Sequence, residues 1–85
     1  MYYKVSMQSA SGEMMPTFQV SRIEEAETKE EAIQKAMDRE KALNANNRGF
    51  KCRLISCEET TKFMYEVQRY MDHEVDVSVV VAEIA

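Results

Sequence analysis

The chain has 85 residues, about 45% of them apolar, and fifteen acidic against eleven basic residues give a formal net charge of −4. This length suits one domain with one small core, so we expect residues 1–85 to form a single domain. The acidic balance argues against direct nucleic-acid binding by the chain as a whole, because such binders usually carry a basic field. No apolar run approaches the ~20 residues of a membrane-spanning helix, and the first residues lack the apolar block of a signal peptide. We therefore expect a cytoplasmic protein that does not associate with membranes.

The first quarter of the chain has the pattern of two strands. Tyr3, Val5 and Met7 alternate with polar residues over 2–8, which is the period of a half-buried strand. A second strand is expected over 17–24, after a small polar turn. The loop between the two is longer than a tight two-residue turn, so the pattern predicts a hairpin with an extended connection.

A helix is predicted over 28–47. Thr28 and Glu31 match a capping box, in which each side chain accepts from the other residue's backbone amide, and Glu31 also forms a favourable pair with Lys35. An apolar stripe follows at helical spacing, made of Ala32, Ile33, Ala36, Met37 and Leu43. Glu40 interrupts that stripe, and we expect it to lie in water beyond the edge of the sheet, because charged side chains are rarely buried unpaired.

The second half of the chain predicts two further strands, over 50–57 and 75–84, with an ambiguous segment at 58–73 between them. Its apolar residues share one helical arc, which favours a helix, although its content of Thr, Tyr, Phe and Val also suits a strand. Ser56 with Glu59 would supply a second capping box. The expected fold class is therefore α+β, with two layers. An antiparallel sheet carries helix 28–47 on one face, in the order ββαβαβ or, alternatively, ββαβββ.

The two cysteines are expected to be free thiols. Cys52 and Cys57 are five residues apart, and an odd spacing on a strand places them on opposite faces, roughly 16 Å from each other. A disulfide requires Cα atoms closer than about 7 Å, so a bridge would need the chain to bend between them.

Catalytic chemistry has few candidates in this chain. The single histidine, His73, lies within an acidic stretch at 72–76 that matches neither a zinc spacing nor a calcium loop. Two glycines are too few for a dinucleotide- or phosphate-binding loop. We therefore expect no enzyme, no cofactor and no metal, and the sequence assigns no catalytic, cofactor-binding or metal-ligating residue.

The most unusual feature is an acidic cluster. Five carboxylates fall within eight residues: Glu24, Glu25, Glu27, Glu30 and Glu31. A helix N-terminus favours negative charge, which accounts for the last three without any function. The functional interpretation is a negative surface that binds a protein partner with a basic surface. Met14 and Met15, in the loop before the second strand, are candidate adaptable contact residues.

A basic stripe offers an alternative. Arg48, Lys51 and Arg53 surround Phe50, and single-strand binders combine positive grooves with aromatic platforms. Phe50 falls on the face predicted to meet the core, opposite Lys51 and Arg53, so a solvated strand face is the simpler interpretation and single-stranded nucleic-acid binding the weaker hypothesis.

The order of elements and the acidic charge resemble those of small phage-encoded proteins that disarm bacterial defence systems, including anti-CRISPR proteins. The resemblance covers architecture and charge and includes no motif, so it assigns no residue. It implies a non-enzymatic inhibitor that blocks the basic site of a nucleic-acid-handling complex. A second hypothesis is a subunit of a homo-oligomeric assembly, for instance a homodimer, or a small enzyme whose site forms between subunits.

Overall fold

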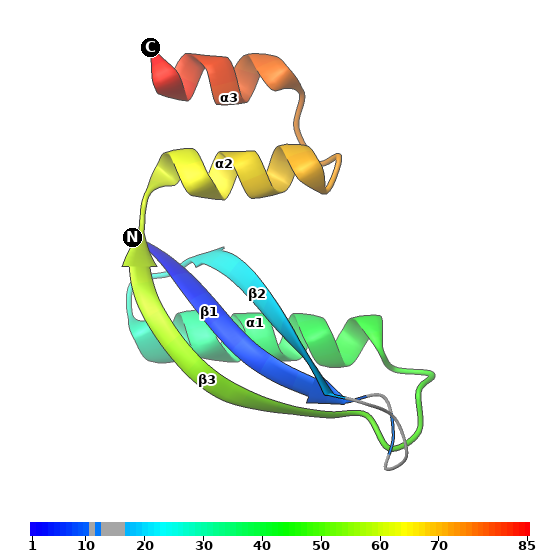
Figure 1. Cartoon of the computed structure of the whole chain (residues 1–85). Helices are drawn as coiled ribbons and strands as arrows, with labels where there is room; N and C mark the ends of the chain where they lie inside the picture. Colours follow the sequence, from blue (N-terminus) through cyan, green and yellow to red (C-terminus); the bar gives the residue numbers. More distant parts are fainter. Residues whose placement is uncertain (11, 13–16) are drawn as a thin grey trace.

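The computed structural model describes residues 1–10, 12 and 17–85, so that Met14 and Met15 lie outside the described residues. Within this part of the chain, β1 (Tyr2–Ala10), β2 (Thr17–Glu25) and β3 (Lys51–Thr60) form an antiparallel sheet in the order β2-β1-β3. The helices are α1 (Lys29–Leu43), α2 (Lys62–Met71) and α3 (Val77–Ile84). Helix α1 lies against the sheet, α2 packs on the β2 side, and α3 lies outside α2, farthest from the sheet (Figure 1). The predicted α+β fold class is confirmed.

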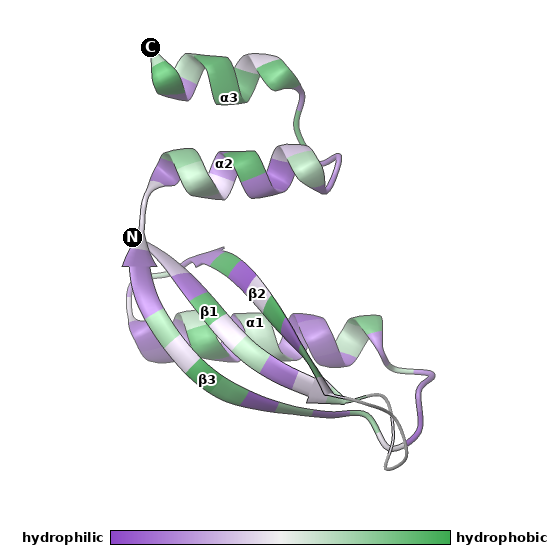
Figure 2. Ribbon diagram, viewed as in Figure 1, coloured by the Kyte–Doolittle hydropathy of each residue, from purple (hydrophilic) through white to green (hydrophobic). Residues whose placement is uncertain are grey.

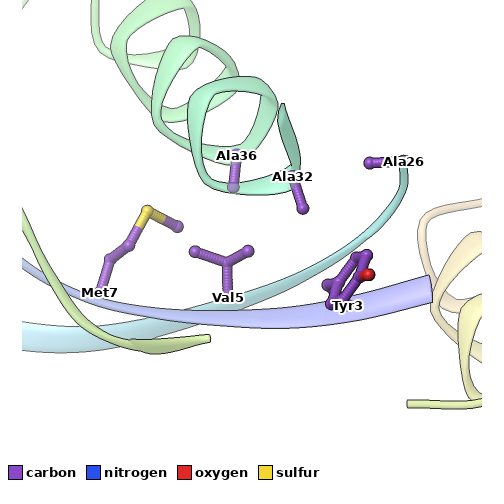
Figure 3. Close-up of a cluster of buried hydrophobic side chains, with 6 residues drawn as sticks. All are labelled: Tyr3, Val5, Met7, Ala26, Ala32 and Ala36. Carbon is purple, nitrogen blue, oxygen red and sulfur yellow. The ribbon is translucent and has the colours of Figure 1, made fainter. Parts of the chain in front are cut away.

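The core lies between β1 and α1. Tyr3, Val5 and Met7 point from the central strand toward Ala32 and Ala36 of the helix (Figure 3). All five side chains are buried, as the alternation over 2–8 and the apolar stripe of the predicted helix indicate. Alanine at both helix positions lets the helix axis approach the sheet closely, so the larger strand side chains fill the space between the two layers. This core is small, and α1 and β1 supply most of it.

Helix α1 begins as predicted and ends earlier. The Thr28 hydroxyl accepts a hydrogen bond from the Glu31 amide at 3.2 Å, and Lys35 Nζ lies 3.2 Å from Glu31 Oε1. The helix ends at Leu43 with Asn44 as its cap, one turn before the predicted end at residue 47. The Asn44 side chain donates to the Glu40 carbonyl at 2.8 Å, which satisfies a terminal acceptor and competes with continuation of the helix.

The prediction for Glu40 is wrong. Its side chain is 5% exposed and continues the buried row of Ala32 and Ala36, each four residues apart. Arg22 of β2 donates from Nε to Glu40 Oε1 at 2.8 Å. Cross-strand pairing puts Arg22 opposite Val5, on the face that α1 covers. The sequence around Glu40 does not reveal this partner, because Arg22 lies eighteen residues away on another element.

A β-bulge in β3 corrects the prediction for the cysteines. The pairing of β1 with β3 shifts between Ser6 and Met7, so that Val5 faces Cys57 and Ser9 faces Cys52. The extra residue reverses the alternation, and both cysteines pack against the core instead of lying on opposite faces. Both are free thiols, as predicted.

The ambiguous segment is a helix, although its predicted cap is wrong. Ser56 lies within β3, and the hydroxyl of Thr61 accepts from the Met64 amide at 3.2 Å as the N-cap of α2. The strand therefore continues three residues past its predicted end at Cys57, through Thr60. Glu58 and Glu59 become strand residues as a result.

The predicted final strand is also wrong, since residues 77–84 form α3. The Asp76 carboxylate accepts from the Ser78 amide at 3.0 Å and starts the helix. A returning strand would begin on the β2 side, where Gln68 of α2 is bonded to both the N–H and the C=O of Ile23. Those two edge groups are satisfied by α2, and the valine-rich segment packs on α2 as a helix.

Candidate interaction surface

The antiparallel register gathers acidic residues at one end of the sheet. Tyr3 of the central strand pairs with Glu24 on one side and with Glu59 on the other, so the last residues of β2 and β3 lie on either side of the start of β1. Helix α1 begins at the same end. Lys29 and Glu30 of its first turn are close enough to Cys57 of β3 to affect the pKa of that thiol. Burial is the main cause that raises this pKa, and the two nearby charges have smaller, opposing effects.

We call this region the acidic end and define it by six exposed carboxylates: Glu25, Glu27, Glu30, Glu31, Glu58 and Glu59. Glu58 and Glu59 were not among the predicted site residues, because the sequence placed them in the ambiguous segment. No local signal marks them as strand residues, because glutamate is depleted in strands. The contact of Tyr2 with Glu25 raises the pKa of the tyrosine, as expected beside concentrated negative charge.

Three lysines offset part of this charge. Lys35 is engaged, since it lies 3.2 Å from Glu31 and donates to the Glu25 carbonyl at 2.9 Å. Lys4 is the cross-strand neighbour of Glu58, and Lys29 stands in the first turn of α1. Six carboxylates against three ammonium groups leave the acidic end with a negative field.

Glu24 does not belong to this surface. Its side chain is buried, and Arg39 Nε of α1 lies 3.1 Å from Glu24 Oε1. Burial raises the pKa of the Glu24 carboxyl, and the nearby guanidinium groups of Arg39 and Arg22 only partly oppose that effect. Of the five predicted contact residues, four are therefore accessible, while Glu24 has a structural role.

A chain of ion pairs joins the sheet, α1 and the α2–α3 turn. Arg22 lies 3.9 Å from Asp72, and Glu74 lies 3.8 Å from Arg39 and 3.6 Å from Arg69. In the acidic stretch at 72–76, Asp72 and Glu74 are therefore structural residues that pair with arginines of other elements. The chain of ion pairs also explains how α2 is held in place with little apolar contact to the core.

Polar contacts complete the attachment of α2. Gln68 accepts from the Ile23 amide at 2.8 Å and donates to the Ile23 carbonyl at 3.0 Å. The rings of Tyr2 and Tyr65 lie 5.0 Å apart, and Glu66 is buried beside Arg69 at 3.3 Å. The face of α2 toward the sheet is thus mostly polar, which leaves its apolar arc directed away from the sheet.

The predicted basic stripe lies at the opposite end of the sheet. Lys51 and Arg53 line a hollow of about 320 Å³ together with Ser9 and Cys52. Arg53 donates to Gln8 Oε1 at 2.7 Å on the face that α1 leaves uncovered. The fold separates charge along the sheet, with carboxylates at one end and these basic groups at the other.

His73 lies at the end of α2, where it is exposed and adopts a left-handed backbone with φ of 61°. Its amide donates to the Tyr70 carbonyl and the Glu74 amide to the Arg69 carbonyl, which is the Schellman pattern of a helix C-terminus. Within the described ranges, no group of three or more His, Cys, Asp or Glu side chains is arranged to hold a metal ion. None of the helices described is long and apolar enough to cross a membrane.

Comparisons with protein-family models, with curated proteins and with solved structures find no match to this chain.

Proposed function

We propose that this protein is a non-enzymatic binding module of the cytoplasm that docks its acidic end on the basic surface of a protein partner. The observation that carries the proposal is the convergence of two strand ends and a helix start, which groups six exposed carboxylates from separate parts of the chain. Such a field speeds association with a positive surface and selects against negative ones.

A basic surface of this kind is typical of proteins that handle nucleic acids, where it faces phosphate. A small acidic module bound there would compete with the nucleic acid and act as an inhibitor. The helix dipole accounts for Glu30 and Glu31, but not for Glu25, Glu58 and Glu59, which lie on strands. These strand carboxylates favour binding over helix capping alone.

The test begins with capture of partners from lysate of the native host and continues with the purified partner by calorimetry. We expect Glu27→Lys to weaken binding by about tenfold and added salt to weaken the wild-type complex. Asp38→Lys is the matched control, because it makes the same charge change on an exposed position of α1 away from the acidic end. Equal effects of the two variants, or affinity independent of salt, would contradict the proposal.

A further inference from the structure

Helices α2 and α3 carry eight of the thirteen large apolar side chains that are exposed in the described part of the chain. The apolar surface of these helices is made of seven large side chains that are between 36% and 69% exposed: Phe63, Met64, Tyr70, Met71, Val77, Val81 and Ile84. Val79 is also exposed, but it lies on the other side of α3 from Val77 and Val81. Figure 2 shows α3 as the most uniformly hydrophobic helix of the molecule, although it lies farthest from the core. We call this surface the hairpin face.

Side chains of the hairpin face follow helical rows. On α3, Val77, Val81 and Ile84 stand at positions i, i+4 and i+7, with exposures of 57%, 56% and 69%. This spacing is that of a helix–helix seam. On α2, Met64 and Met71 form a second row one heptad apart. Rows of this kind pack against other helices, and no element described in this chain covers them.

Helix α3 is poorly suited to stand alone. It has eight residues, four of them valines, and none is buried. Isolated helices shorter than about 12 residues are marginal in water, and valine loses side-chain freedom in a helix. Packing on α2 and the Lys62–Glu83 contact at 3.4 Å support one side only. A second packing surface would supply what the sequence of α3 lacks.

Two whole-molecule quantities show that the fold is more open than that of a compact monomer of this size. The accessible surface is 5937 Å², whereas a monomer of 9.9 kDa is expected to have about 5,200 Å². The radius of gyration is 14.1 Å, against about 12 Å for a compact chain of this length. The excess area is on the order of 700 Å².

The seven side chains of the hairpin face are about half exposed on average, and together they present on the order of several hundred Å² of apolar surface. A stable interface of standard size buries about 800 Å² from each partner. The face therefore supplies a large part of the area that one copy contributes to a stable dimer.

We propose that the occupant of the hairpin face is a second copy of this chain, with the two α2–α3 hairpins forming a four-helix bundle about a two-fold axis. A chain of charge −4 repels its own copy over most of its surface, and this uncharged face is where that repulsion is least. A two-fold axis brings identical patches together, and rows of Val, Met and Ile are compatible with themselves.

The experiment is sedimentation equilibrium of the full chain over a range reaching about 100 µM. We expect twice the chain mass of 9.9 kDa for the wild type. Val81→Glu, and independently Met71→Glu, should raise the dissociation constant of the dimer by about tenfold or more. Ala82→Glu should not, because it places the same charge on the next residue of α3, about 100° from the valine row.

Circular dichroism checks that each variant keeps its helices and sheet, and two variants on different helices guard against a local folding defect. A wild type that remains monomeric throughout the range would overturn the proposal and leave the face to another partner. A dimer that both variants leave intact would also overturn it, because the interface would then lie elsewhere. Neither result involves the acidic end. The dimer proposal can therefore be wrong while the proposed function holds, and the reverse is also true.

Discussion

At the residue scale, the most informative side chain is Glu40. A buried carboxylate costs free energy unless it is paired, and Arg22 supplies the pair at 2.8 Å from the neighbouring layer. The two residues are eighteen positions apart, and the sequence around either gives no sign of the other. The ion pair joins the C-terminal part of α1 to β2 beside the small core.

Removing only Arg22 should be costly. We expect Arg22→Met to lower the free energy of unfolding by about 2–4 kcal/mol, because Glu40 would stay buried without its partner. The double variant Arg22→Met, Glu40→Leu should recover most of that loss, since an apolar pair can replace a buried ion pair. Urea denaturation of the two single variants and the double variant measures the coupling. Strictly additive losses would show that the two side chains act independently.

Glu24 should make stability depend on pH. Burial raises its folded-state pKa above the ordinary value of 4.5, so the folded protein binds this proton more tightly than the unfolded chain does. The stability that this carboxyl contributes is therefore complete below pH 4.5 and is lost as pH rises through the folded-state pKa.

The stability of a Glu24→Gln variant relative to the wild type should therefore be highest at neutral pH. We expect the stability of Glu24→Gln relative to wild type to be higher at pH 7 than at pH 4, measured by urea denaturation at both values. Glu27→Gln, at an exposed position nearby, is the control. A relative stability that falls on going from pH 4 to pH 7 would contradict the assigned direction of the shift.

At the scale of elements, the attachment of α2 to β2 decides the topology. Gln68 satisfies the edge groups of Ile23, and the ion pairs of Glu74 hold the following turn. Because Gln68 occupies both backbone groups of Ile23, a strand cannot pair with that part of the edge. The predicted order ββαβαβ is therefore correct up to α2 and wrong for the last element.

Loss of the Gln68 contacts should loosen this attachment. We expect Gln68→Ala to lower the free energy of unfolding by about 1–2 kcal/mol, because two backbone groups of Ile23 lose their partner. Hydrogen exchange of the Ile23 amide should accelerate at the same time. Gln34→Ala on the exposed side of α1 is the matched control, and we expect it to change stability by less than about 0.5 kcal/mol. Unchanged exchange at Ile23 would show that the amide is protected by other means.

At the scale of the whole molecule, two surfaces of opposite character lie on different elements. The acidic end belongs to the sheet and α1, and the hairpin face belongs to α2 and α3. If both proposals hold, a dimer built through the hairpin face carries two acidic ends, and a partner with two basic sites would bind it more tightly than it binds one copy.

Salt should separate the two surfaces. Added salt screens the repulsion between copies that each carry a charge of −4, so we expect dimerisation to strengthen or stay constant as ionic strength rises. Binding through the acidic end should weaken over the same range. Sedimentation equilibrium and calorimetry at about 50 mM and 500 mM salt measure the two trends. Weakening of the dimer by salt would indicate an interface held by charge.

The sequence by itself determined the elements whose signals are local. Alternation over 2–8 identified the strand that supplies most of the core, and the Thr28 cap with its helical stripe identified α1, because both patterns depend on neighbours within a few residues.

The acidic cluster was visible only as a run along the chain. Tertiary structure removed Glu24 from the surface and added Glu58 and Glu59, because register is set by pairing between distant strands. Three other features likewise depend on residues far away in the sequence. They are the burial of Glu40, the bulge that turns both cysteines inward, and the helix over 77–84. A short valine-rich segment suits a strand by propensity, and only the occupied edge of β2 and the surface of α2 make it a helix.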